Sequence, residues 1–148
     1  MDATDARGGL PAGYKLVVGP PDVDSYLHLR ASAGLTPRTR ELAAAGLPGS
    51  WVAVHVLREP SGVPVGMGRA IGDGGLNFEI VDMAVLPEHQ RLGLGDAILS
   101  FLIGRIREAA PTGAFVSLLA DPPGQALYTR HGFHETAPAS LGMAMVLV

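Results

Sequence analysis

The stretch "QRLGLGDA", residues 90–97, lies between an apolar strand pattern and a long amphipathic helix pattern, and its composition suggests chemistry. Glycine costs about 0.5–1 kcal/mol relative to alanine inside regular structure, so Gly93 and Gly95 at a helix start need a reason. One reason is a tight turn. Another is an anion, because bare backbone N–H groups and the positive end of a helix dipole bind phosphate, and Arg91 could reach an outer phosphate oxygen.

Two common nucleotide-binding motifs do not fit this stretch. A dinucleotide fingerprint needs a third glycine, and Ile98 stands in its place. A Walker loop needs a lysine followed by serine or threonine, which the segment lacks. From the glycines alone, a plain strand-to-helix turn and a pyrophosphate-binding loop both remain open.

Two carboxylates, Glu79 and Asp82, interrupt the apolar strand that leads into this loop. A buried carboxylate without a partner is strongly unfavourable, so each must be paired, solvated in a cleft or functional. Strand alternation places the two on opposite faces, so only one would share a cleft with a ligand unless a bulge intervenes. The structural interpretation of either is an ion pair with an arginine such as Arg69.

The composition limits the classes of protein to which the chain can belong. Its 148 residues suit one domain with one core, and a net charge of −3 favours neither nucleic acid nor a membrane as partner. The absence of cysteine excludes disulfides, thiolate metal sites and a cysteine nucleophile, and agrees with a cytoplasmic location. The five histidines show no ligand spacing, so no metal is expected.

The hydrophobic periodicity predicts an α/β protein with a mixed sheet. We expect a flexible N-terminal segment, residues 1–12, and a single domain, residues 13–148. Strands are predicted at 14–18, 51–58, 63–72, 76–86 and 113–120, with two more after Gly132, and helices at 22–34, 36–46, 95–110 and 123–132. Asp22 and Thr36 are the expected caps of the first two helices. From this order of elements we expect mostly antiparallel pairing, one parallel strand and helices on both faces of the sheet.

Two motifs together resemble those of the GNAT superfamily of acyl-CoA-dependent N-acetyltransferases. The segment "MAVLPEHQRLGLGDA", residues 83–97, is similar to its Gln/Arg-x-x-Gly-x-Gly/Ala motif, and "LYTRHGF", residues 127–133, to its Leu-Tyr-x-x-x-Gly-Phe motif. The resemblance covers nearly all the chain and implies a GNAT fold, with a sheet splayed after its fourth strand. "DMAVLP", "LLAD" and "LGM" are nearest to the arylalkylamine-type branch.

The resemblance implies acetyl-CoA as co-substrate and a primary amine as acceptor. The residues so implied to bind the coenzyme are Met83, Ala84, Val85, Gln90, Arg91, Leu92, Gly93, Leu94, Gly95, Asp96, Ala97 and Tyr128. Tyr128 would also act as the general acid at the coenzyme sulfur. One departure is Asp121, which stands where many members carry an asparagine that binds pantetheine.

The base that takes the proton of the amine is either Asp82 or Glu79. Asp82 matches the "D-V-x-V-x-P" carboxylate of arylalkylamine acetyltransferases and is preferred, acting through a water, whereas Glu79 matches the glutamate of histone-type members. Because the chain has no cysteine, direct transfer in a ternary complex is expected rather than an acyl-thiol intermediate.

Two other functions remain open from the sequence. A non-catalytic acyl-CoA-binding or sensor module would keep "QRLGLG" but would need neither Tyr128 nor a strand carboxylate. A protein N-acetyltransferase would use the same chemistry on a different acceptor. The sequence specifies neither the acceptor amine nor the oligomeric state, and a homodimer stays open.

Overall fold

The computed structural model describes residues 9–148, which fall into two compact units, the chain up to Leu118 and the segment Leu119–Val148. The expected flexible segment, residues 1–12, lies for the most part outside the described residues. All elements that position the glycine loop and the two strand carboxylates belong to the first unit.

The first unit is built on a five-stranded sheet in the order β1-β2-β3-β4-β5. Its strands are β1 Tyr14–Val18, β2 Val52–Arg58, β3 Val63–Gly72, β4 Asn77–Val85 and β5 Phe115–Ser117. The first four pair antiparallel, and β5 runs parallel to β4. The predicted mixed sheet is therefore confirmed.

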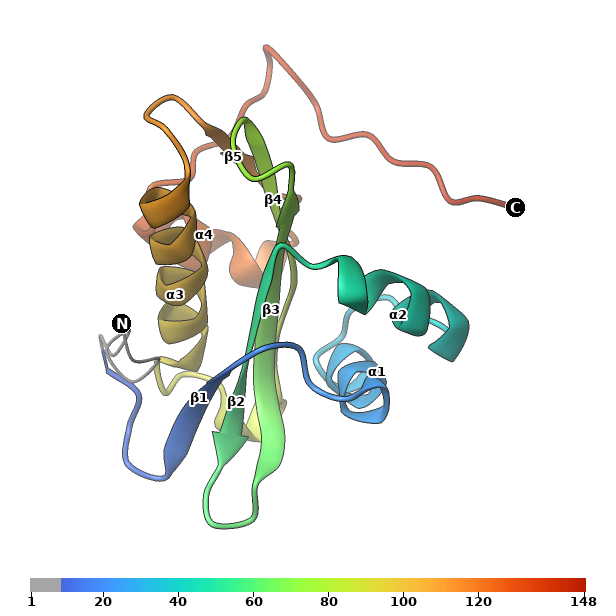
Figure 1. Cartoon of the computed structure of the whole chain (residues 1–148), viewed down its shortest axis with the longest axis vertical. Coiled ribbons are helices and arrows are strands. Elements are labelled where there is room, and N and C mark those ends of the chain that lie inside the picture. Colours follow the sequence, from blue (N-terminus) through green and yellow to red (C-terminus); the bar gives the residue numbers. More distant parts are fainter. Residues whose placement is uncertain (1–8) are drawn as a thin grey trace. The chain divides into compact units, whose positions relative to one another are not determined.

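Helices cover both faces of this sheet (Figure 1). Helices α1 (Val23–Ser32) and α2 (Arg40–Gly46) lie on one face, and α3 (Leu94–Ala109) lies on the other. The core between α3 and the central strands is apolar and closed, because Ile98, Leu99 and Leu102 are 0% exposed. This packing fixes the direction of α3 and thus where its N-terminus points.

The starts of the first two helices are capped by side chains. The Asp22 carboxylate accepts a hydrogen bond from the Ser25 N–H at 2.8 Å, as predicted, and this contact lowers the pKa of Asp22 below its usual range. The predicted cap Thr36 is wrong, because α2 begins at Arg40 and Thr39 caps it. The carbonyl of Thr36 instead accepts two hydrogen bonds from the Arg30 guanidinium, which holds residue 36 in the connecting loop.

A β-bulge interrupts β4 at Asp82 and Met83. Arg69 on β3 pairs with Val81, but Met67 pairs with Ala84, so Gly68 faces two residues. Asp82 adopts a left-handed backbone conformation, with φ 58°. A Cβ at Gly68 would lie 2.6 Å from the Met83 sulfur and 2.7 Å from Cγ2 of Ile98 on α3, so no side chain fits opposite the bulge without a shift of its neighbours. The bulge breaks the alternation that would otherwise place Glu79 and Asp82 on opposite faces.

Strand β5 is shorter than the strand predicted at residues 113–120. It pairs only with Asn77–Glu79 of β4, and Phe115 is 56% exposed. Beyond Glu79, β4 has no β5 partner, so the two strands separate there as the resemblance implied. A single short parallel pairing leaves one edge of residues 80–85 open in the first unit.

The second unit contains a short 3-10 turn, Pro122–Gly124, and helix α4 (Gln125–Arg130). The two strands predicted after Gly132 are wrong, because the described residues 133–148 contain no strand. A strand forms only where a neighbouring strand accepts its hydrogen bonds, and no such pairing is present for this segment among the described residues. Its apolar residues are exposed, among them Leu141, Met143, Met145, Val146, Leu147 and Val148.

Candidate functional site

The loop between β4 and α3 is held by its own side chains and by an unusual backbone. The Gln90 amide donates to the carbonyl of Val85 at 2.9 Å, which ties the loop to the end of β4. His89, one residue earlier, contacts the Tyr14 hydroxyl at 2.7 Å. Arg91 and Gly93 both have positive φ, 62° and 87°. The Gln90 side chain therefore binds within the protein, whereas the Arg91 side chain is exposed.

The N-terminus of α3 lacks the caps that α1 and α2 have. Its N-cap residue is Gly93, and no side chain caps it among the described residues. The N–H of Ala97 donates to the Gly93 carbonyl at 3.1 Å, which removes Ala97 from the set of available donors. The N–H groups of Leu94 and Gly95, in the first turn, have no partner within a helix. Uncapped amides at the positive end of a 16-residue helix fit an anion such as pyrophosphate.

Strand β4 has an open edge on the N-terminal side of the loop that leads to α3. Met83, within the bulge, and Ala84 and Val85, after it, lie beyond the residues of β4 that pair with β5. Their backbone is held on the other side by β3, through the pairs Met67–Ala84 and Gly66–Val85. A strand with one free edge can hydrogen-bond an extended ligand as a further strand would.

The Asp82 carboxylate lies at the centre of a buried ion-pair cluster, formed with Arg30, Arg69 and Tyr26. Its two oxygens accept from Arg30 Nη1 at 2.5 Å, Arg69 Nε at 2.7 Å and the Tyr26 hydroxyl at 3.0 Å. The side chains of Asp82 and Arg30 are each 7% exposed. Both carboxylate oxygens are therefore already engaged, and the predicted pairing with Arg69 is present.

The other members of this cluster are also satisfied. Arg69 donates to the Ser50 hydroxyl at 2.8 Å, and Arg30 donates to Thr36 as described above. Burial, then the charge of Asp82, raises the pKa of Tyr26, so its hydroxyl remains a donor at neutral pH. Tyr26 and Arg30 were not predicted as partners of Asp82. Their spacing of four residues, which places both on one face of α1, was the available signal.

Glu79 faces the same side of the sheet as this cluster. Glu79 pairs with Ile71 of β3, so both side chains are on the same face of the sheet, and Ile71 lines the hollow described next. The bulge brings Asp82 to that face as well. Its side chain is half-buried and makes no hydrogen bond or ion pair with any of residues 9–148. Of the two predicted carboxylates, Glu79 is the one available to a ligand.

A hollow of about 250 Å³ opens beside the cluster, between α2, the α1–α2 connection and the middle strands. Its walls combine an apolar side with two arginines, a tyrosine and the Asp82 carboxylate. The lining residues are Tyr26, Arg38, Leu42, Ala43, Gly46, Leu47, Arg69, Ile71, Val81 and Asp82.

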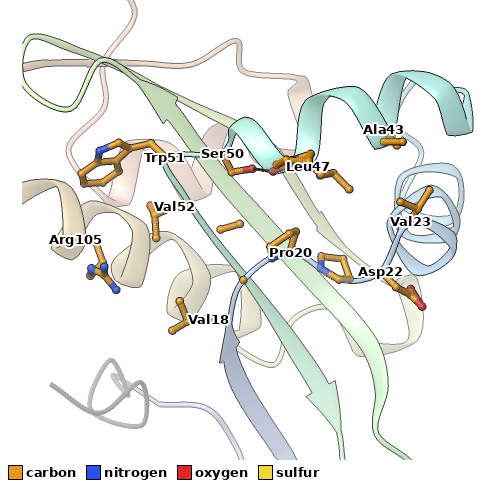
Figure 2. A pocket seen from close by; sticks show the side chains of 15 residues that line it. Val18, Pro20, Asp22, Val23, Ala43, Leu47, Ser50, Trp51, Val52 and Arg105 are labelled. Carbon is orange, nitrogen blue, oxygen red and sulfur yellow. Dashed lines mark hydrogen bonds between the residues drawn. The ribbon is translucent and has the colours of Figure 1, made fainter.

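A larger hollow of about 620 Å³ lies elsewhere, where β1 ends and β2 begins (Figure 2). Pro20, Leu47 and Val52 line it, with Trp51 and Arg105 toward one end and Asp22 toward the other. Arg105 is 11 residues beyond Leu94 on α3, which is about 16 Å along a helix. The polar groups Asp22 and Ser50 are used within the protein, as a helix cap and as a donor to Leu47. On α3 this hollow is therefore lined far from the start of the helix.

Tyr128 belongs to the second unit, on α4. Its ring packs edge-to-face on Phe133, with 6.2 Å between ring centroids, and lies against Gly124. Burial, then the charge of Asp121, raises the pKa of Tyr128. The hydroxyl therefore stays protonated at neutral pH, as a proton donor requires.

The described residues contain neither a metal-binding group nor a membrane-spanning helix. Within residues 9–148, no three histidine, aspartate or glutamate side chains gather closely enough to hold a metal ion. None of the helices described is both long and apolar enough to cross a bilayer.

Comparisons with known proteins agree with this architecture. Residues 49–135 match the model of the acetyltransferase (GNAT) domain. A crystal structure of a protein of unknown function from meticillin-resistant Staphylococcus aureus, described as a probable acetyltransferase, is 38% identical, with a TM-score of 0.86 over 90% of this chain and 99% of that one.

Curated relatives of this chain are longer than it is. A chloroplastic serotonin N-acetyltransferase of Oryza sativa is 36% identical over 83% of this chain and 62% of its own length. An uncharacterized N-acetyltransferase of Pyropia yezoensis is 28% identical over 76% and 64%. The chain thus spans less than two thirds of these relatives. With most of the chain, including the glycine loop and β4, matched by the family model, the protein belongs to the GNAT family of acetyltransferases.

Proposed function

We propose that this GNAT-family acetyltransferase moves an acetyl group from acetyl-CoA to a small primary amine, by direct transfer in a ternary complex. The observation that carries the proposal is the uncapped first turn of α3 behind the left-handed Gly93. There the N–H groups of Leu94 and Gly95 would hold the pyrophosphate, with Arg91 beside them. The backbone of Met83–Val85 would hydrogen-bond the pantetheine arm.

Acetyl-CoA, when bound, supplies the acetyl group as a reactive thioester. In the transfer the amine nitrogen bonds to the acetyl carbon, the carbon–sulfur bond breaks, one proton leaves the nitrogen and one reaches the sulfur. The chain must therefore provide a base near the amine and an acid near the sulfur. Tyr128, with its raised pKa, is the proposed acid.

We assign the base to Glu79 and a positioning role to Asp82. Glu79 is half-buried and has no partner among the described residues, so it can accept a proton directly or through a water. Asp82 was preferred from the sequence, but its oxygens already accept from Arg30, Arg69 and Tyr26. In this role Asp82 fixes the bulge, and with it the direction of the backbone at Met83.

Thiol release from acetyl-CoA, measured over a panel of amines, tests the proposal. Glu79→Gln should lower kcat by about a hundredfold or more while calorimetry shows unchanged affinity for CoA. Tyr128→Phe should lower kcat and remove the alkaline limb of the pH profile. A protein that binds CoA but acetylates no amine or peptide would be a sensor module, and unchanged turnover in Glu79→Gln would return the base to Asp82.

A further inference from the structure

The hollow beside Asp82 carries more positive than negative charge. Arg38 and Arg69 line it together with one carboxylate, Asp82, and Arg30 lies on the same carboxylate. Two guanidinium groups thus pair with one carboxylate, and a third, that of Arg38, lines the same hollow. Glu79 lies on the same face of the sheet but does not line the hollow. If its charge is counted as well, the net charge of these side chains is still positive.

The arginines in and beside this hollow differ in whether they already have partners within the protein. Arg30 and Arg69 are both paired with Asp82 and are held by further hydrogen bonds. Arg38, on the α1–α2 connection, is exposed and takes part in no ion pair or hydrogen bond within residues 9–148. Its planar fork of donors is therefore available to a ligand, and it matches a carboxylate in two parallel hydrogen bonds.

The remaining wall of the hollow is apolar. Leu42, Leu47, Ile71 and Val81 contribute aliphatic side chains to it. Its volume of about 250 Å³ lies below the range of about 300–1,000 Å³ that is usual for larger ligands, so it suits a small molecule. A small ligand that uses both walls has an apolar part and an anionic group.

From these contacts we infer that the acceptor is an amine that also carries a carboxylate, namely an amino acid with an apolar side chain. The inference rests on the proposed function, of which it names the substrate class. Arg38 binds the carboxylate, the aliphatic wall takes the side chain, and the amine is directed toward Glu79. Arg38 is thus a specificity residue.

The charge of the hollow also acts on the amine itself. A plain alkylammonium ion brings a further positive charge into a hollow that two arginines line and is disfavoured, whereas an amino acid brings its own compensating carboxylate. The same surroundings favour the neutral form of the bound amine, which is the form that attacks.

Matched substrate pairs that differ only in the carboxylate provide the test. Leucine is compared with isoamylamine, and phenylalanine with phenethylamine, by thiol release from acetyl-CoA on the full chain. We expect kcat/KM to favour each amino acid by about tenfold or more, the size of a charge-assisted hydrogen bond. Arg38→Gln should remove this preference by raising KM for the amino acids and leaving that for the plain amines unchanged.

Arg40→Gln is the control variant, because Arg40 is exposed, lies two residues away and pairs with Asp24 outside the hollow. It should keep the preference. Acetylation of the plain amines with no preference for the amino acids would overturn the inference and leave the proposed function standing. Acetylation of neither class, with CoA still bound, would overturn both.

Discussion

Among the described residues of the first unit, two sites hold a residue other than glycine in the left-handed region, Asp82 in β4 and Arg91 in the loop before α3. They differ in what surrounds them. At Asp82 each oxygen of the side chain is engaged, and the carboxylate is buried. At Arg91 the side chain is exposed, and the helix that follows begins without a side-chain cap. One site is closed by the protein, and the other is open.

The difference indicates where a ligand is needed. A left-handed conformation costs about 1–2 kcal/mol outside glycine and persists where the surroundings compensate for it. The ion-pair cluster supplies that compensation at Asp82. At Arg91 the side chain makes no such contact among the described residues, and the loop is held by its neighbours Gln90 and His89. The phosphate of the proposed coenzyme would add a further contact there. A helix cap contributes about 0.5–2 kcal/mol, and α3 can lack one because its packing against the sheet holds it.

The closed site should give the largest effect on stability. Asp82→Gly relieves the backbone strain but leaves Arg30 and Arg69 without their anion in a buried place, and removal of one partner of a buried pair costs about 3–5 kcal/mol. We expect a net loss of about 2–4 kcal/mol in the free energy of unfolding, after strain relief of about 1 kcal/mol. Urea denaturation measures it.

The exposed pair of Arg40 and Asp24 is the control for that loss. Their side chains are 63% and 78% exposed, so Arg40→Gln should change the free energy of unfolding by less than about 1 kcal/mol. Equal effects of Asp82→Gly and Arg40→Gln would show that the buried cluster contributes no more than a surface pair, and the contrast between the two sites would fail.

Glycine at the open site should matter more than glycine within the same helix. Gly93→Ala places a side chain at φ 87°, which costs about 1–2 kcal/mol, and a loop that turns away from this strain loses an amide contact with phosphate. We expect a loss of stability of that size and a roughly tenfold weaker affinity for CoA by calorimetry.

Gly104→Ala supplies the comparison, because Gly104 is in the interior of α3 with open space around its Cα. This change should stabilise the protein by about 0.5–1 kcal/mol and leave CoA affinity unchanged. If both alanine variants bind CoA like the unchanged protein, the start of α3 is not the anion site.

The sequence predicted the elements whose signals are local. The bounds of β1 and β3 were predicted to the residue, and Asp22 was identified as a cap from its place before an apolar periodicity. The glycine loop was likewise predicted, because its signal lies in eight consecutive residues. Each of these features depends on neighbours in the chain.

Features that depend on distant residues were missed. Thr39 rather than Thr36 caps α2, and the Thr36 carbonyl is bound by Arg30 instead. The bulge at Asp82 lies opposite Gly68, on another strand. The strands expected after Gly132 needed a partner that residues 9–148 do not provide. Alternation therefore predicted opposite faces for Glu79 and Asp82, which the bulge reverses.

Replacement by glycine should change the stability of the protein far less at the open site than at the closed one. Arg91→Gly relieves the strain at φ 62° and removes no contact among the described residues, so the free energy of unfolding should stay within about 1 kcal/mol. CoA affinity should fall by about tenfold through the lost guanidinium. A loss of stability comparable with that of Asp82→Gly would mean that the protein itself compensates the strain at Arg91.

The smallest expected effect concerns how the stability of the protein falls at alkaline pH, through Tyr26 at the closed site. Burial, then the charge of Asp82, raises the pKa of Tyr26 above its usual value of 10.0. A pKa that is higher in the folded than in the unfolded state means that the folded state binds the proton more tightly, so this stabilisation is complete below pH 10 and is lost as pH rises through the folded value. Tyr26→Phe should therefore cost about 1 kcal/mol at neutral pH, for the lost hydrogen bond, and flatten the decline in stability above pH 10. Urea denaturation at neutral and alkaline pH measures both, and an unchanged alkaline decline in the variant would place its origin outside the Asp82 cluster.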